Sequence, residues 1–252
     1  MWNKPHLMKE VADLLFAAGA AGLLVAGAVW AARMEFFPLR EVVVMHELRE
    51  VKRDEFERVL EGRMRGNFFS VNLEGLRHAL EQLPWVRKAE VRRQWPGRIE
   101  VTLEEHSVAA FWGAATGQLV NTHGEVFTAS LRALPATPLP VLSGPPGLSA
   151  EMLGYYQQAE AVLRPLGRTP RVLTISPRLA VQFKLDDGMI VELGREQAKS
   201  PVRQRLERFV EYYPSVLGVA RQVPQVVDMR YPNGFALHVA AATQGSGNKG
   251  KP

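Results

Sequence analysis

Residues Leu14–Ala32 read LLFAAGAAGLLVAGAVWAA and contain no charged side chain. A helix of this length rises about 28 Å at roughly 1.5 Å per residue, close to the ~30 Å hydrocarbon core of a bilayer. A core helix of a soluble domain would carry polar positions on one face, and this stretch has none. The pattern therefore predicts one transmembrane helix, preceded by a short tail, residues 1–13, and followed by globular sequence.

The region around this apolar run leaves two questions open. Lys4 and Lys9, with the small residues Ala26–Ala28, also fit a cleavable signal peptide, although a signal h-region is typically about 7–15 residues and this run is longer. The positive-inside rule does not set the orientation, because two basic residues precede the run and two, Arg33 and Arg40, follow it. The short tail and the long following portion favour a cytoplasmic N-terminus with the bulk of the chain exported.

The composition after the anchor is that of folded, globular material. The chain is 46% hydrophobic and 23% charged, and the roughly 220 residues after the anchor leave room for one large domain or two ordinary ones. A net charge of +5 is mildly basic, which suits anionic partners but equally suits simple solubility. The absence of cysteine excludes disulfide bonds and thiol chemistry. Residues 243–252, rich in glycine, serine, lysine and asparagine, are expected to be disordered.

Residues 36–105 predict a compact β-α-α-β-β unit. Its helices are expected to begin at the capping residues Asp54 and Asn72, and its hairpin to turn at Pro96–Gly97. Packing two helices on a three-stranded sheet is the simplest way to bury the apolar faces. The predicted elements are a strand at 42–48, helices at 54–62 and 72–83, and strands at 86–95 and 99–103.

Residues 107–240 predict a larger unit of strands and helices, so that the fold class of the whole chain is α+β. In the clearest hairpin, every second residue from Leu179 to Leu185 points inward before a turn at Asp187–Gly188. Ser149 is expected to cap one helix, and Ser200–Pro201 to open another. The other predicted strands are 111–112, 119–120, 125–127, 141–142, 172–175, 189–193, 227–231 and 235–239, with the last two joined by an Asn233–Gly234 turn.

The sequence contains no constellation typical of catalysis or metal binding. Its six histidines lack ligand-like spacing, and no Gly-x-Ser-x-Gly elbow, glycine-rich phosphate loop or His-Glu-x-x-His motif occurs. Glu104 and His106 could meet on one face of a strand, but a solvated strand end explains them better. We therefore expect no catalytic residue, metal, cofactor or small-molecule substrate. Arginines of the 86–98 hairpin and the polar face of the last helix (Arg203, Arg205, Arg208) fit solvated faces or protein contacts better than nucleic-acid binding.

The final predicted strand, Phe235–Val239, is the best candidate for a functional surface. A terminal strand often lies at the edge of a sheet and presents unpaired N–H and C=O groups. Such an edge can receive a strand from another chain, with the main chain giving affinity and alternate side chains giving selectivity. The alternative is an internal strand that is covered on both sides.

Several short motifs, in a specific order, resemble the FtsQ/DivIB family of bacterial cell-division proteins. Those of the first unit are Phe37–Arg40, Asn67–Phe69, Leu83–Val86 and Trp95–Pro96. Those of the second unit are Asn121–Phe127, Val191–Arg195, Arg208–Val210, Tyr213–Pro214, Val227–Tyr231 and Asn233–Ala236. Together with the apolar run they cover most of residues 12–240, and the closing pair is the most distinctive.

The resemblance implies a polypeptide-transport-associated (POTRA) domain for residues 36–105, associated with recruitment to the division site, and the family's β-domain for residues 107–240. It implies a non-enzymatic, bitopic inner-membrane scaffold at the division septum, with a cytoplasmic N-terminus and a periplasmic bulk. Such a scaffold binds FtsB and FtsL, links early and late division proteins and supports septal peptidoglycan synthesis.

In the family, the terminal strands of the β-domain receive FtsB by strand addition. Carried over to this sequence, that contact points to Tyr231, Asn233, Gly234, Phe235 and Ala236, with Arg178 as a weaker candidate. The sequence departs from the family pattern in carrying His238–Val239 where an aromatic residue is expected near the end of the strand.

Two other functions are alternatives to the division scaffold. A POTRA-type unit could handle unfolded chains in periplasmic protein transport or assembly, although such factors carry several units or a β-barrel. A cell-wall hydrolase or transferase would need a nucleophile or metal constellation, which the sequence lacks.

Overall fold

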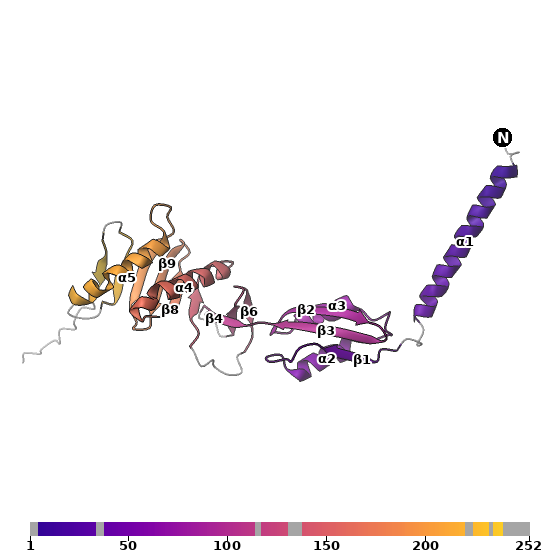
Figure 1. Ribbon diagram of the computed structural model, residues 1–252, viewed down its shortest axis with the longest axis horizontal. Coiled ribbons are helices and arrows are strands. Elements are labelled where there is room, and N and C mark those ends of the chain that lie inside the picture. Colours follow the sequence, from indigo (N-terminus) through magenta and orange to yellow (C-terminus); the bar gives the residue numbers. More distant parts are fainter. Residues whose placement is uncertain are drawn as a thin grey trace, which may run out of the picture. The chain divides into compact units, whose positions relative to one another are not determined.

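The computed structural model describes residues 5–33, 38–113, 117–130, 138–219, 224–231 and 234–238. The chain divides between His106 and Ser107 into two compact units, each with its own sheet (Figure 1). Asn233 and the predicted disordered segment, residues 243–252, lie outside the described residues.

The N-terminal helix α1 (Pro5–Arg33) is continuous and contains the predicted membrane span. Its segment Met8–Trp30 is long and apolar enough to cross a membrane, and none of that segment is buried inside the protein. Among the described residues no second helix meets these criteria. The helix begins before Leu14, so residues 5–13 of the predicted tail are helical as well.

The first unit contains a three-stranded sheet in the order β1-β3-β2. Strand β1 (Glu41–Val44) pairs in parallel with β3 (Arg98–Glu105), and β2 (Val86–Gln94) pairs antiparallel with β3. Helix α3 (Leu73–Glu81) packs on β2, and α2 (Arg53–Arg63) packs on α3. The predicted arrangement of two helices on a three-stranded sheet is confirmed. Its fully buried core residues include Leu76, Leu80, Ile99 and Val101.

The two helices of this unit begin in different ways. Asn72 caps α3 as predicted, because its side-chain oxygen accepts a hydrogen bond from the Gly75 N–H at 2.9 Å. The prediction that Asp54 caps α2 is wrong, since Lys52 occupies the N-cap and Asp54 lies in the first turn. The loop before α2 is instead held by the Glu105 carboxylate, which accepts from the N–H groups of residues 49–51 at 2.9–3.2 Å.

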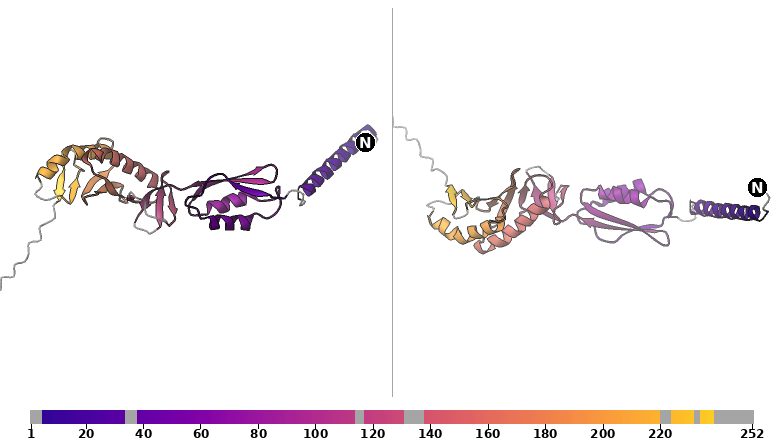
Figure 2. Two further views of the ribbon diagram at one scale, coloured as in Figure 1. Left: turned by 60° about the horizontal axis from the view of Figure 1, so that its bottom comes forward. Right: turned by 90° about the horizontal axis from the view of Figure 1, so that it is seen from above.

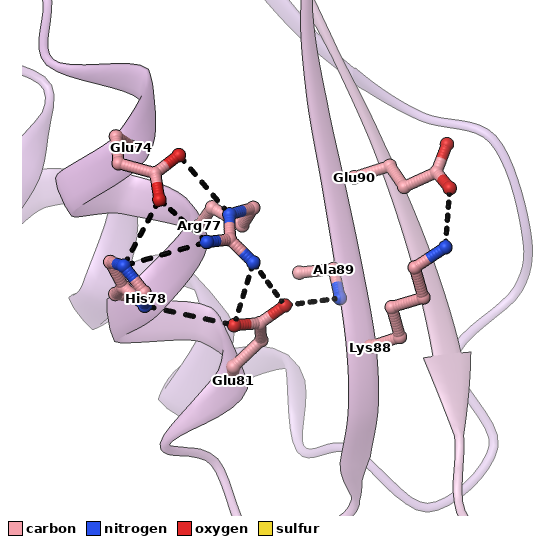
Figure 3. A network of polar contacts seen from close by, with 7 residues as sticks. All are labelled: Glu74, Arg77, His78, Glu81, Lys88, Ala89 and Glu90. Atoms are coloured by element: carbon pink, nitrogen blue, oxygen red, sulfur yellow. Dashed lines mark hydrogen bonds and ion pairs between the residues drawn. The ribbon is translucent and has the colours of Figure 1, made fainter.

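A polar network ties α3 to the edge strand β2 (Figure 3). Arg77 lies between Glu74 and Glu81 and hydrogen-bonds to both carboxylates, and its hydrogen bond lowers the pKa of Glu74. Glu81 also accepts from the Ala89 N–H at 3.3 Å, close to the irregularity in the β2–β3 register between Val86 and Lys88. The helix therefore occupies a backbone donor of the edge strand.

The second unit is a mixed nine-stranded sheet in the order β12-β11-β10-β9-β8-β7-β4-β5-β6. Three of its pairings are parallel, β10 with β11, β4 with β7 and β7 with β8, and the others are antiparallel. The strands are β4 (Val108–Trp112), β5 (Gln118–Asn121), β6 (Val126–Thr128), β7 (Val141–Ser143), β8 (Pro170–Ile175), β9 (Ala180–Leu185), β10 (Ile190–Arg195), β11 (Val226–Asp228) and β12 (Ala236–His238).

Two helices cover one face of this sheet, as Figure 2 shows. Helix α4 (Ser149–Leu163), continued by the 3-10 turn η1 (Arg164–Leu166), packs on β7 and β8. Helix α5 (Val202–Val219) packs on β10 and against α4. Their apolar faces bury Met152, Leu163 and Phe209 against strand residues such as Leu173 and Phe183. The α+β class is confirmed.

Three local predictions in the second unit are wrong. Ser149 does not cap α4, because Leu148 is the N-cap and the Ser149 hydroxyl donates to the Gly124 carbonyl at 2.6 Å. Leu179 does not point inward, because it lies in the β8–β9 turn with φ +60° and is 54% exposed. Helix α5 begins directly after Ser200–Pro201, but the Val202 N–H donates to the Glu196 carboxylate, so the capping role predicted for Ser200 belongs to a side chain outside that pair.

Candidate protein-binding edge

The terminal hairpin, β11 and β12, forms one edge of the nine-stranded sheet. Strand β11 is parallel to β10, and β12 returns antiparallel to β11 with Ala236 opposite Asp228. Among the described residues, β12 pairs with β11 alone. The outer side of an edge strand carries backbone N–H and C=O groups that can pair with another strand. This edge therefore has the backbone geometry that strand addition requires.

The residues predicted to bind the partner emerge at one end of the sheet. Asp228 of β11 lies opposite Glu192 of β10 and Ala236 of β12. Arg195 of β10 lies opposite Ala180 of β9. The end of β11 and the starts of β12 and β9 therefore lie at the same end of the sheet. This brings Tyr231, Gly234, Phe235 and Ala236 together beside the hairpin, while Asn233 lies outside the described residues.

Arg178 lies at the same end but on a different part of it. It is exposed in the turn before β9, which is three strands from β12. At roughly 4.8 Å between neighbouring strands, this separates it from β12 by about 14 Å. Arg178 therefore lies at the periphery of the candidate site, which we call its rim, and not beside the edge strand β12. Its neighbour Leu179, an exposed apolar residue that the sequence pattern placed in the core, lies on the same rim.

The two aromatic residues of the hairpin differ in exposure. Tyr231 is 56% exposed. Phe235 is half-buried, packs against the core and lies with its ring centroid 6.0 Å from that of Tyr212 on α5. Phe235 thus holds the hairpin on the helix, whereas Tyr231 presents a large amphipathic surface of the kind that is enriched at protein interfaces.

The sequence predicts that the arginines of α5 lie on a face that is solvated or contacts a protein, but two of them bind carbonyl groups within the chain. Arg205 is only 2% exposed and donates to the Arg195 carbonyl at the end of β10. Arg208 donates to the carbonyls of Met229 at 3.4 Å and Tyr231 at 3.1 Å. Arg208 thereby positions the segment that carries Tyr231. Sequence reasoning missed this role, although Arg208 lies in one of the motifs that pointed to the family.

A buried carboxylate fixes the end of β11. Asp228 is 3% exposed, and both of its oxygens accept from the Arg230 guanidinium, at 2.9 and 2.6 Å. Oδ1 also accepts from the Arg230 N–H at 3.0 Å, and the guanidinium reaches the Glu192 carboxylate on β10 at 3.4 Å. The hydrogen-bonded guanidinium lowers the pKa of Asp228.

Gly194 makes room for this arrangement. Its φ is +72°, and a Cβ at that position would lie 3.0 Å from Cγ of Arg230. A side chain at position 194 would therefore displace the arginine and strain the backbone at the same time.

Two other sheet edges, β2 and β6, differ from the β12 edge. The β2 edge carries the paired charges of Lys88, Glu90 and Arg92, and Glu81 occupies its Ala89 N–H. Charged side chains on an edge strand disfavour pairing with another chain. At the far edge of the second unit, β6 is as short as β12, and the whole sheet separates it from Tyr231 and Phe235.

Acidic side chains near the end of β3 take part in contacts within the chain. None of the His, Asp and Glu side chains in the described part of the chain gather into a group that could hold a metal ion. Glu104 pairs with Arg87 at 2.8 Å, and the neighbouring Glu105 holds the loop before α2. A hollow of about 410 Å³ beside α5 has only polar and charged lining residues, namely Lys199, Ser200, Gln204, Glu207, Arg208 and Glu211. Ligand pockets are mostly apolar, so this hollow does not have that character.

The membrane helix, the small two-helix unit and the open sheet edge define a class of protein: single-pass membrane proteins whose folded portion offers surfaces for other proteins. Residues 37–106 match the family model described as POTRA domain, FtsQ-type, and residues 110–230 match the model for the C-terminal region of cell division protein FtsQ/DivIB. The chain belongs to the FtsQ/DivIB family of cell division proteins.

Curated relatives agree over nearly the whole chain. Cell division protein FtsQ of Burkholderia pseudomallei is 39% identical over 240 residues, which cover 95% of each chain. The FtsQ protein of Nitrosospira multiformis is 35% identical over 94% of this chain and 98% of its own. The Neisseria gonorrhoeae protein is 30% identical over 95% and 96%, respectively. The chain is therefore a single-pass membrane protein of the division machinery, with protein partners in that machinery.

Proposed function

We propose that this protein is a non-catalytic division scaffold whose β-domain binds FtsB, together with FtsL, by strand addition at β12. The observation that carries the proposal is the position of β12 at the sheet edge, with its outer side unpaired by any described strand. Through this contact the scaffold would link early and late division proteins and support septal peptidoglycan synthesis. In this scaffold residues 36–105 would form the POTRA domain, and residues 107–240 would form the β-domain that binds the partner.

The side chains around β12 support the same proposal. Tyr231 offers an exposed aromatic surface next to the edge, and Arg208 fixes the carbonyl of Tyr231 from α5. A backbone segment that is already positioned beside a preformed edge lowers the ordering penalty of binding. Arg178 and Leu179 would contact the partner only where it extends about 14 Å beyond β12 along the end of the sheet.

The membrane anchor would contribute through geometry. We place the N-terminus in the cytoplasm and the folded bulk in the periplasm, at the inner membrane of the division septum. A partner that is anchored in the same membrane is confined with the scaffold to two dimensions, which raises its effective concentration.

The exposed residue Tyr231 gives the cleanest test. Tyr231→Glu should reduce co-purification of FtsB with the full chain from membranes by at least about tenfold, because aromatic hot-spot residues contribute about 2 kcal/mol or more. The matched control is Val126→Glu, which places the same charge on an exposed apolar residue, 41% exposed, at the opposite edge strand β6. Phe235→Glu is less informative, because Phe235 also packs on α5.

Crosslinking tests whether the contact is strand addition. Because the chain has no cysteine, His238→Cys provides a single site on β12 for a photo-crosslinker. We expect a crosslink to FtsB that Tyr231→Glu removes. Full FtsB recovery with Tyr231→Glu, equal loss with Val126→Glu, or no crosslink from position 238 would contradict the proposal. Capture of many unrelated unfolded chains would favour a transport or assembly factor instead.

A further inference from the structure

Exposed aromatic side chains gather at one end of the first unit. Trp95, at the end of the β2–β3 hairpin, is 65% exposed, and Phe69, in the loop before α3, is 44% exposed. Their ring centroids lie 6.5 Å apart, and both rings contact the buried Phe68, at 5.9 and 5.1 Å. We call Phe68, Phe69, Trp95 and the Pro96–Gly97 turn the aromatic tip. Contiguous exposed apolar patches can mark protein or membrane interaction sites, whereas singly scattered exposed apolar residues are normal.

Polar contacts hold the tip in this conformation. The Arg93 guanidinium donates to the carbonyls of Phe68, Phe69 and Val71 at 2.7–3.2 Å. The Asn67 side chain accepts from the N–H groups of Phe69 and Ser70 at 3.1 and 2.9 Å. The loop therefore presents Phe69 outward through specific hydrogen bonds.

The chain itself places the tip close to the membrane helix. The Arg40 N–H donates to the Gly97 carbonyl at 2.8 Å, and a Cβ at Gly97 would lie 3.0 Å from the Pro38 carbonyl. The first described residues after α1 thus lie against the turn of the tip. Helix α1 ends at Arg33, and the five residue steps to Pro38 span at most about 18 Å when fully extended. Pro38 therefore stays within about 18 Å of the end of the membrane helix, whatever the orientation of the unit.

The charge around the tip is basic. Arg40, Arg93 and Arg98 are all exposed, and Arg98 pairs with the exposed Glu41 at 3.1 Å. Tryptophan and other aromatic residues concentrate at the membrane–water interface, and exposed arginines attract anionic headgroups. An aromatic and basic surface on a short tether to a membrane span matches the chemistry of that interface.

We propose that the aromatic tip binds the surface of the membrane in which α1 is anchored, with Phe69 and Trp95 at headgroup level and the arginines on anionic lipid phosphates. This contact would fix the height and tilt of the POTRA domain over the bilayer. It is independent of FtsB binding at β12.

The test uses the full chain in lipid nanodiscs, made either of phosphatidylcholine alone or with one quarter phosphatidylglycerol. Gln94→Cys labels the tip with an environment-sensitive fluorophore, and Lys88→Cys labels the same strand about 20 Å away at roughly 3.3 Å per residue. Both residues are exposed, and the native chain has no cysteine. With phosphatidylglycerol, spin-labelled lipids should quench the label at position 94 at least about twofold more than the label at 88.

Variants assign the signal to the tip. Phe69→Ser with Trp95→Ser should abolish the difference between positions 94 and 88. Arg40→Gln with Arg98→Gln leaves the rings in place and should reduce the dependence on phosphatidylglycerol, whereas Arg53→Gln on α2 should not. Position 53 is a matched control because its side chain is 89% exposed and also pairs with a glutamate.

Three results would overturn the proposal. They are equal quenching at positions 94 and 88, a signal that the serine variant retains, and a signal that does not respond to phosphatidylglycerol. A blue shift at position 94 that requires an added division protein instead of lipid would also overturn it, and would assign the tip to a protein partner.

Discussion

Replacing Asp228 by asparagine tests whether a buried ion pair holds the candidate edge in place. In the native chain, both Asp228 oxygens bind the Arg230 guanidinium, and Oδ1 also accepts the Arg230 N–H. The amide of Asp228→Asn keeps one acceptor and turns a donor toward the guanidinium. Hydrogen bonds to charged groups contribute about 1.5–3 kcal/mol each. Because the Arg230 side chain is 57% exposed, solvent screens the pair, and we expect a loss of about 2 kcal/mol.

Thermal unfolding of the full chain in mild detergent, followed by circular dichroism, measures this loss. For a unit of about 150 residues, roughly 2 kcal/mol corresponds to a lowering of Tm by about 6 °C. The control is Glu192→Gln, which touches the same guanidinium at 3.4 Å but has a side chain that is 35% exposed. We expect that variant to lose at most about 0.5–1 kcal/mol. Equal losses in the two variants would contradict the assignment of burial as the source of the effect.

The pH dependence provides a second check with a definite sign. Arg230 lowers the folded-state pKa of Asp228 below its ordinary value of 3.8. The stabilisation is therefore present above that ordinary value and is lost as the pH falls through the lowered one. The difference in stability between the native chain and Asp228→Asn should be constant from neutral pH down to about 4.5 and shrink below that, on the linkage argument. A difference that persists unchanged at pH 2 would refute the reasoning.

Two further substitutions test the packing and the capping. Leu173→Ala on the central strand β8, where the side chain is 0% exposed, should lower the free energy of unfolding by about 3 kcal/mol, whereas Leu179→Ala in the exposed turn should change it by less than about 0.5 kcal/mol in urea titrations. Asn72→Ala should destabilise the first unit by about 1 kcal/mol through loss of the α3 cap, whereas Lys52→Ala, at an N-cap without a side-chain hydrogen bond, should be near neutral in the same assay.

The sequence predicts most elements because local signals decide them. Asn72 caps α3 because its side chain finds an N–H three residues away, and the 180–193 hairpin forms because alternating apolar residues flank a two-residue turn. Two of the failures occur where a group outside the local pattern competes with the local signal. Ser149 donates to Gly124, which is 25 positions earlier in the chain, and the N–H of Val202 finds a carboxylate six positions earlier instead of a local cap.

The candidate site is harder to predict than the elements that carry it. The pattern of β11 and β12 gives two short strands and a turn, but nothing in it states that β11 runs parallel to β10. That pairing places the end of β11 beside Glu192 and Gly194, and it brings Arg208 of α5 within reach of two carbonyls. A helix-period pattern assigns Arg208 to a polar face, and only the packing of α5 determines whether that face meets solvent or the hairpin.

Over the described residues β12 is short, so the proposed strand addition would gain from a membrane anchor as well as from an edge. A strand of three residues can offer only a few backbone hydrogen bonds, each worth about 0.5–1.5 kcal/mol. Association costs an estimated 4–15 kcal/mol in lost translational and rotational freedom, so these bonds alone give weak binding. Tyr231 can add an aromatic anchor, and confinement of both chains to one membrane removes part of the association penalty.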